Sequence, residues 1–225
     1  RTTMPTIKPY NNIAQSGLDV FSDERFSLDR EADNPEAIVL RSANLHEETL
    51  GDNLLAVARA GAGTNNVPTD ELTGRGVAVM NTPGANASAV KELVLAALLV
   101  GARNLLTAWD ATRQLSGDHA SLSKTVESMK KDYTGFELPS RTIGIVGLGK
   151  IGVLVANACA SLGMSVWGYD PHISVANAWQ LDARVQQANS LSALLSQVNA
   201  LSLHVPLINA TRGLIGAEQL AQLQP

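Results

Sequence analysis

The sequence carries three glycines at a spacing that could hold a phosphate group. Gly147, Gly149 and Gly152 form the pattern G-x-G-x-x-G between an apolar run and a helical stretch. The first glycine permits a tight turn, the second lets the backbone approach a ligand closely, and the third lets the helix pack on the strand. The free N–H groups and partial positive charge of a helix N-terminus then suit a diphosphate.

An acidic residue follows this pattern at the place that dinucleotide binding requires. Asp170 lies 18 residues after Gly152, at the end of the next predicted strand. A carboxylate there accepts hydrogen bonds from the adenosine ribose and repels a 2′-phosphate, so the sequence predicts NAD rather than NADP. The alternative is an ordinary glycine-rich turn followed by a surface aspartate. Lys150, inside the turn, either contacts a phosphate or is solvated.

Composition excludes several classes of protein. The 225 residues contain 17 Lys+Arg and 21 Asp+Glu, giving a net charge of −4, which argues against a surface for nucleic acid or anionic membrane. A single cysteine, Cys159, excludes a disulfide scaffold and thiolate-bound metal, and it is predicted to be a small packing residue. The apolar run Leu93–Ala102 is too short to cross a bilayer and predicts a buried helix. Because the N-terminus lacks an apolar signal core, we expect a cytoplasmic protein.

Alternating β-like and helical stretches predict an α/β fold with parallel sheets, in two domains. We expect a small α/β domain over residues 1–87 and a second α/β domain over residues 88–225. A polar surface segment at 113–133 is expected to join two domains, and partial helix is open for it. Strands are predicted at 37–40, 54–58, 77–80, 142–147, 165–170, 183–185 and 200–205. Helices are predicted at 88–109, 151–162, 190–197 and 217–223, the third of them opened by a capping serine, Ser190.

Several segments, in this order along the chain, resemble the D-2-hydroxyacid dehydrogenase family. The resemblance runs from Ile38 to Pro225 and is more specific than the glycine pattern alone. Its segments are Val39–Ser42, Ala58–Gly63 with Asn66, Gly76–Gly84 with Asn86, Glu92, Val146–Gly152, Gly168–Pro171 and Leu203–Pro206. It implies a flavodoxin-like substrate domain at residues 1–87 and a Rossmann domain, a doubly wound parallel sheet incomplete at its C-terminus, at residues 88–225.

The resemblance also assigns roles on the cofactor side. Ala62 falls in a loop that approaches the nicotinamide of NAD in this family, and Asp170 is expected to bind the ribose. The residues expected to form the phosphate loop are Gly147, Gly149, Lys150, Ile151 and Gly152. The residues expected in a loop over the cofactor are His204, Val205 and Pro206.

On the substrate side the resemblance implies contacts with anionic groups. Arg41 and Ser42 match positions that bind the anionic groups of phosphorylated substrates, and an arginine fork suits a carboxylate or phosphate. Asn86 matches a substrate-contacting asparagine, although a helix-capping role is equally open. Arg59 is a further candidate for anion binding. A surface arginine at a strand end is the alternative for Arg41.

No catalytic residue of the family is expected within the chain. The family's arginine, glutamate and acid/base histidine follow later segments, so we expect them beyond Pro225 and the chain to be part of a longer protein. The segment Leu207–Gly213 imitates the family's catalytic arginine signature but aligns better with a preceding loop, so Arg212 is predicted to be a loop residue. His204 is not expected to carry a proton.

The implied function is NAD-dependent oxidation of 3-phospho-D-glycerate to 3-phosphohydroxypyruvate, in serine biosynthesis. The expected partner is the small substrate, with no nucleic acid or membrane and no metal, and the protein is expected to form a homodimer or homotetramer. Oxidation of another D-2-hydroxyacid, such as glycerate or lactate, is an alternative. A non-catalytic NAD-binding scaffold of the same fold is another, and the residues 1–225 alone are expected to be inactive.

Overall fold

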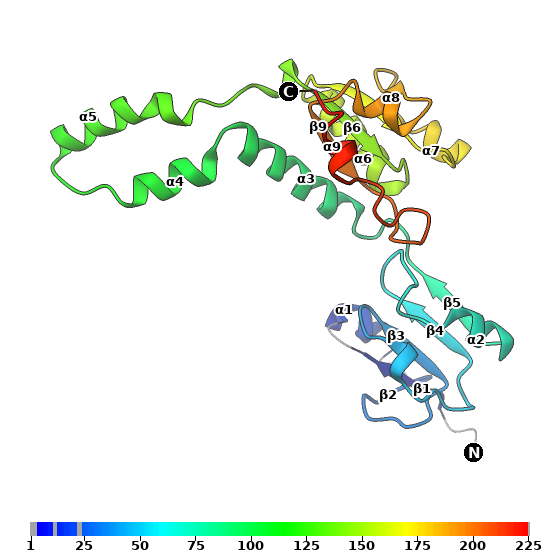
Figure 1. Ribbon diagram of the computed structural model, residues 1–225. Coiled ribbons are helices and arrows are strands. Elements are labelled where there is room, and N and C mark those ends of the chain that lie inside the picture. Colours follow the sequence, from blue (N-terminus) through cyan, green and yellow to red (C-terminus); the bar gives the residue numbers. More distant parts are fainter. Residues whose placement is uncertain (1–3, 11–12, 22–23, 225) are drawn as a thin grey trace. The chain divides into compact units, whose positions relative to one another are not determined.

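The computed structural model describes residues 4–10, 13–21 and 24–224, which form two compact units divided between Asn86 and Ala87 (Figure 1). Residues 1–3, part of the N-terminal segment without an apolar core, lie outside this description. The division falls one residue before the boundary predicted after residue 87. Both units are built on parallel sheets, so the predicted α/β class is confirmed.

The described part of the first unit holds a parallel sheet with strand order β2-β1-β3-β4-β5. Its buried centre includes Ile38, Leu40, Val57 and Leu72. The strands are β1 (Thr6–Pro9), β2 (Ser27–Leu28), β3 (Ala37–Leu40), β4 (Ala56–Arg59) and β5 (Ala78–Asn81). The short helices are α1 (Gln15–Leu18), η1 (Asp19–Phe21), η2 (Leu45–Glu47) and α2 (Thr69–Gly74).

The sequence did not predict β1 and β2. Strand β1 contains Lys8 and ends at Pro9, and β2 has only two residues, so neither forms an apolar run that stands out in the sequence. Tertiary pairing creates both strands, because β1 lies between β2 and β3 and bonds to each. The three strands that were predicted here begin within two residues of the observed ones.

The second unit holds a parallel sheet with strand order β8-β7-β6-β9. Ile143 and Ile145 on β6 are fully buried with residues of α6, whereas Val146 packs with residues of α8. The strands are β6 (Thr142–Val146), β7 (Ser165–Tyr169), β8 (Gln186–Gln187) and β9 (Ala200–Leu203). The helices are α3 (Ala87–Ala102), α4 (Leu105–Arg113), α5 (His119–Met129), η3 (Lys130–Tyr133), η4 (Leu138–Ser140), α6 (Lys150–Ser161), α7 (Val175–Ala178), α8 (Leu191–Leu195) and α9 (Ala217–Leu220).

The prediction of one buried helix over 88–109 was wrong in two respects. The helix breaks at Asn104, whose φ of 51° is left-handed, and α4 begins after it. Helix α3 packs on α6 through a stripe that includes Val94, Leu95 and Leu98, while Leu93 on another side is 70% exposed. An apolar sequence therefore did not ensure burial, because α3 has one main packing partner in its unit.

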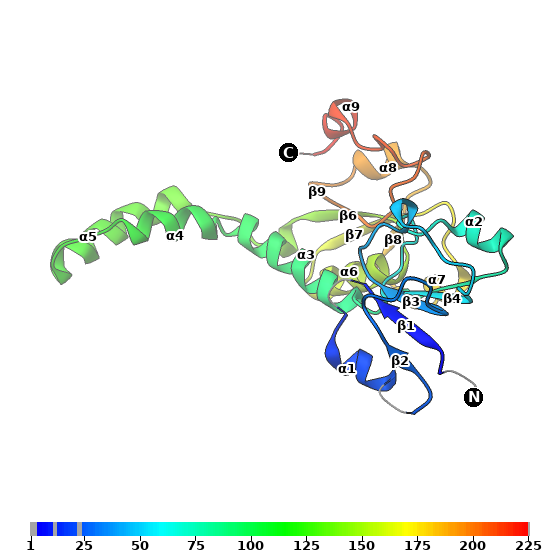
Figure 2. The same ribbon diagram turned by 90° about the horizontal axis from the view of Figure 1, so that it is seen from below.

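The polar surface segment 113–133, for which the sequence left partial helix open, is largely helical. Asp118 caps α5 by accepting a hydrogen bond from the Ser121 N–H at 2.9 Å. Helices α4 and α5 form a hairpin that extends away from the sheet of the second unit (Figures 1 and 2). Neither helix contains a buried residue.

Two local predictions in this unit have clear outcomes. Ser190 caps α8 as predicted, with its Oγ accepting from the Ala193 N–H at 3.1 Å. The strand predicted at 183–185 is instead β8, which begins at Gln186. Across the described ranges, we find no helix with the length and apolar character needed to span a membrane.

Candidate functional site

The glycine turn connects β6 to α6 and needs glycine at its first position. Gly147 has a φ of +89°, a conformation that side chains rarely adopt. A Cβ at this position would lie 2.8 Å from the backbone of His204, which follows β9. The Gly147 N–H donates to the Tyr169 carbonyl at 2.9 Å, so the turn is anchored to the end of β7.

The other two glycines have the distinct environments expected of a phosphate turn. A Cβ at Gly152 would lie 1.9 Å from the Gly147 carbonyl oxygen, so this glycine lets the helix approach the turn. A Cβ at Gly149 would meet no atom within 4 Å, so this position faces open space at the N-terminus of α6. The turn therefore leaves room for a diphosphate beside Gly149.

Asp170 is tied to the same turn. Its Oδ2 accepts from the Leu148 N–H and its Oδ1 accepts from the His172 N–H, both at 2.8 Å. Each carboxylate oxygen keeps further acceptor capacity for a ribose hydroxyl. Leu148 is buried, and a Cβ at Gly168 would lie 2.9 Å from its Cδ1. The sequence pattern treats Leu148 as a variable position and gave no signal of this anchoring role.

The loop after β9 lies beside the turn. The His204 N–H donates to the Val146 carbonyl at 2.7 Å, and a Cβ at Gly147 would lie 2.8 Å from Cγ1 of Val205. The His204 Nε2 is 2.9 Å from the Ser202 Oγ, a contact that the sequence gave no reason to expect. Burial lowers the pKa of His204, so the neutral imidazole predominates at neutral pH. Pro206 is exposed.

Three residues of α6 were singled out in the sequence, and two of them, Lys150 and Ile151, are predicted to lie on the cofactor side. Lys150 is exposed in the first turn, and Ile151 packs against the buried core. Cys159 is fully buried, and burial raises the pKa of its thiol to about 11. The thiol is therefore held in its weakly reactive form, and the prediction that Cys159 is a packing residue is confirmed.

In the first unit, the predicted substrate residues follow the carboxyl ends of neighbouring strands. Arg41 and Ser42 follow β3, and Arg59 ends β4. The Asn66 side-chain amide donates to the carbonyls of Arg41, at 3.3 Å, and Ala43, at 2.7 Å. Asn66 therefore holds the backbone that carries Arg41 and Ser42, a role that its place in the resemblance did not reveal.

The loop that carries Ala62 is fixed by the last residue of β5 and by the residue that follows it. The Asn81 Nδ2 donates to the Ala62 carbonyl, and the Gly61 N–H donates to the Thr82 Oγ1, both at 2.7 Å. The Arg59 guanidinium folds over this loop, because Nη1 lies 1.8 Å from where a Cβ on Gly61 would stand. Asn86 is exposed at the last position of the first unit.

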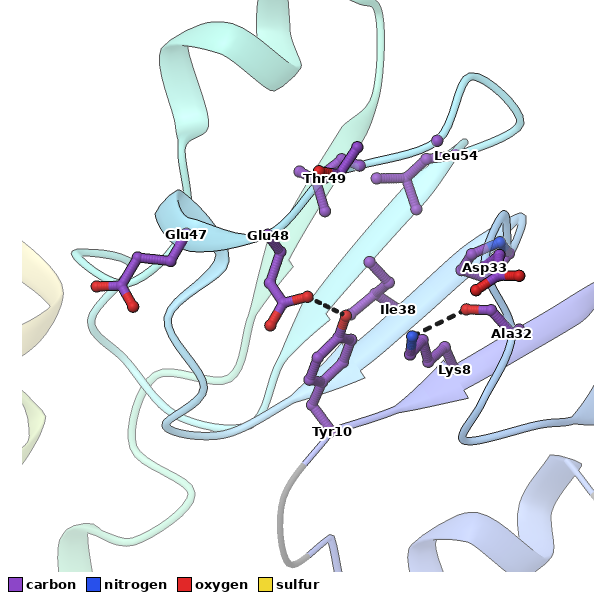
Figure 3. Close-up of a pocket in the computed structure, with 12 residues that line it drawn as sticks. Lys8, Tyr10, Ala32, Asp33, Ile38, Glu47, Glu48, Thr49 and Leu54 are labelled. Atoms are coloured by element: carbon purple, nitrogen blue, oxygen red, sulfur yellow. Dashed lines mark hydrogen bonds between the residues drawn. The ribbon is translucent and has the colours of Figure 1, made fainter.

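A pocket of about 460 Å³ in the first unit is a different feature (Figure 3). In it the Lys8 Nζ donates to the Ala32 carbonyl at 2.9 Å, and the Tyr10 hydroxyl donates to the Glu48 carboxylate at 3.2 Å. Burial, with the Glu48 charge, raises the pKa of Tyr10 to about 12. None of the predicted site residues is among its described lining residues, so this pocket is separate from the predicted site.

Comparison with known proteins defines the class of this protein. Residues 102–225 match the family model described as D-isomer specific 2-hydroxyacid dehydrogenase, NAD binding domain. The chain belongs to this family, and its cofactor is NAD. The predicted resemblance and the predicted cofactor are thereby confirmed.

The chain is similar to named dehydrogenases in sequence and in fold. A D-3-phosphoglycerate dehydrogenase of Mycobacterium bovis is 38% identical over 193 residues, which cover 84% of this chain and 34% of that relative. The chain thus spans about a third of the length of this relative. The fold is similar to the apo form of Rhodotorula graminis D-mandelate dehydrogenase, with a TM-score of 0.78 and 24% identity over 99% of this chain and 72% of that one. It is also similar to the NAD⁺-bound 3-phosphoglycerate dehydrogenase of Entamoeba histolytica, with a TM-score of 0.72 and 23% identity over 99% and 69% of the two chains.

Proposed function

We propose that this chain belongs to an enzyme that oxidises 3-phospho-D-glycerate to 3-phosphohydroxypyruvate with NAD, in the cytoplasm, as a step of serine synthesis. The observation that carries the dehydrogenase proposal is the glycine turn of β6 and α6, with Asp170 bound to its backbone. The substrate proposal is supported by relatives named D-3-phosphoglycerate dehydrogenase and by the arginines at the strand ends of the first unit.

In the proposed mechanism, each part of the chain has a separate task. The N-terminus of α6 and the Gly149 backbone bind the diphosphate, and Asp170 orients the adenosine ribose. When bound, NAD supplies the carbon that accepts the hydride from C2 of the substrate. Arg41 and Arg59 bind the anionic groups of the substrate. The base that takes the hydroxyl proton is not assigned to any residue of this chain.

The substrate proposal is tested with the Arg41→Ala variant in the protein that carries this chain. Losing a charged hydrogen bond should lower kcat/KM for 3-phospho-D-glycerate about 10- to 150-fold. The fall for D-glycerate should be smaller if Arg41 binds the phosphate. Arg75→Ala is the control, because Arg75 lies in the same unit but bonds to the carbonyls of Leu50 and Gly51.

Two results would contradict this substrate. A wild-type protein that prefers D-lactate or D-glycerate would favour the alternative hydroxyacids. A complete protein that binds NADH and turns over none of these acids would favour the non-catalytic scaffold. NADH binding itself is measured separately by calorimetry, so that the cofactor site and the substrate are tested independently.

We also propose that the protein forms a homo-oligomer through the α4–α5 hairpin. Leu106 is 67% exposed and Trp109 is 58% exposed on α4, and Val126 on α5 is 40% exposed. Exposed apolar side chains on both helices of this hairpin are the basis for the proposed interaction surface, and a second copy of the same chain is the commonest partner in soluble oligomers.

This proposal predicts a change of mass in solution. Leu106→Asp should shift the protein toward the monomer in analytical ultracentrifugation. Leu55→Asp is a matched control, since Leu55 is also 67% exposed but lies in the first unit. A wild-type monomer, or an oligomer that both variants leave intact, would contradict the role of the hairpin.

A further inference from the structure

Leu148, at the centre of the glycine turn, is held from three directions. Its N–H donates to Asp170, and its side chain packs against Gly168. Its carbonyl accepts a hydrogen bond from the Asn177 Nδ2 at 3.1 Å. The first two contacts involve residues of the dinucleotide pattern or its neighbouring strand. The third comes from α7, which lies outside that pattern.

We propose that Asn177 is a positioning residue for the diphosphate of NAD, acting through the peptide between Leu148 and Gly149. The C=O and the N–H of a planar trans peptide point in opposite directions. Holding the Leu148 carbonyl on Asn177 therefore aims the Gly149 N–H away from α7. Glycine has wide backbone freedom, so without this bond the peptide samples other orientations and its donor is less well placed.

The surroundings of Asn177 are ordered by hydrogen bonds at both ends of its segment. At the start, the Ser174 Oγ accepts from the Asn177 N–H at 3.2 Å and caps α7. After α7, the Asn157 Nδ2 donates to the Gln180 carbonyl at 2.7 Å, and its Oδ1 accepts from the Asp182 N–H at 2.8 Å. Asn177 is half-buried, and its bond to Leu148 is partly shielded from water.

Asp170 and Asn177 hold different peptides of the glycine turn. Asp170 fixes the peptide that precedes Leu148, because it accepts from the Leu148 N–H. Asn177 fixes the peptide that follows, because it donates to the Leu148 carbonyl. The two peptides flanking Leu148 are thus set by different side chains, and only Asp170 also faces the ribose. Removing the Asn177 side chain should therefore weaken binding of the diphosphate and leave binding of the adenosine unchanged.

This division defines the experiment. In the protein that carries this chain, Asn177→Ala should weaken the binding of NADH and of ADP-ribose about three- to tenfold. This is the loss of affinity expected for one neutral hydrogen bond. Adenosine, which has no phosphate, should bind within twofold of wild type. Asn177→Asp keeps the shape but cannot donate, so it should weaken NADH at least as much. Dissociation constants are measured by calorimetry or by competition with NADH fluorescence.

Asn157→Ala is the matched control. It removes the same kind of amide–carbonyl bond, here to the Gln180 carbonyl after α7, together with the bond from the Asp182 N–H, and neither bond involves the glycine turn. We expect the ratio of NADH to adenosine affinity to stay at the wild-type value in this variant. The inference is overturned if Asn177→Ala binds NADH as wild type does, if it weakens adenosine equally, or if Asn157→Ala changes the ratio as much.

The inference rests on the proposed position of NAD at the turn, and the two can fail separately. If wild type does not bind NADH, or if a Gly149→Val variant binds it normally, the proposed cofactor site is wrong. If Gly149→Val abolishes binding while both Asn177 variants bind normally, the cofactor site stands and the role of Asn177 is refuted.

Discussion

Alanine at Gly149 and alanine at Gly152 add the same methyl group three residues apart, with opposite expected effects. At Gly152 the methyl carbon would lie 1.9 Å from the Gly147 carbonyl oxygen, at least about 1 Å closer than real Cβ atoms approach. At Gly149 it would meet nothing within 4 Å. We expect Gly152→Ala to destabilise the fold, and Gly149→Ala to weaken cofactor binding with little change in stability.

The size of each effect follows from packing. Forcing α6 away from the turn should cost about 1–3 kcal/mol, as overpacking in a core does. For a chain of this length that lowers Tm by roughly 2–12 °C. In Gly149→Ala a strain of the same size appears only when the diphosphate is bound. We therefore expect the affinity for NADH to fall about 5- to 150-fold. Alanine is a poorer N-cap than glycine but loses less chain entropy on folding, and these effects of up to about 1 kcal/mol oppose each other.

The assays are thermal unfolding without ligand and calorimetric titration with NADH, on both variants and wild type. The two variants should separate: one loses stability and the other loses affinity. If Gly149→Ala binds NADH with unchanged affinity, the diphosphate does not lie against this position. If Gly152→Ala unfolds at the wild-type temperature, the close approach between α6 and the turn does not limit stability, and the packing argument is refuted.

Three further predictions concern charge and protonation in the second unit. Asp170→Ala should lower the affinity for NADH about 10- to 150-fold, as expected for lost bonds to a carboxylate, and raise the affinity for NADPH relative to NADH. An unchanged ratio of the two affinities in fluorescence titration would count against the ribose contact. Cys159 should resist thiol reagents at pH 8 in the folded protein and react after unfolding, because it is buried with a raised pKa; labelling of the native protein within minutes would contradict this. Because the pKa of His204 is lowered, its contribution to stability should be complete above about pH 6.5, the unfolded value, and lost as pH falls through the folded pKa. His204→Gln should therefore show a smaller fall in Tm than wild type between pH 7.5 and pH 5, and parallel profiles would exclude this role.

Local chemistry made much of the second unit predictable. The strands β6 and β7 are apolar runs, the turn between β6 and α6 has a fixed glycine spacing, and Ser190 is a typical helix cap. These features depend on residues close together in the chain, which is why a sequence pattern can show them. The place of Asp170 after its strand could be anticipated for the same reason.

Other features exist only because distant segments meet. Asn177 contacts Leu148 across 29 positions of sequence, and Asn66 holds the Arg41 backbone across 25. An amide side chain bonds to whichever carbonyl the fold brings within reach, so its sequence neighbours do not reveal its partner. Likewise, the apolar residues of α3 predict a helix, but only its packing on α6 decides that Val94 is half-buried and Leu93 exposed.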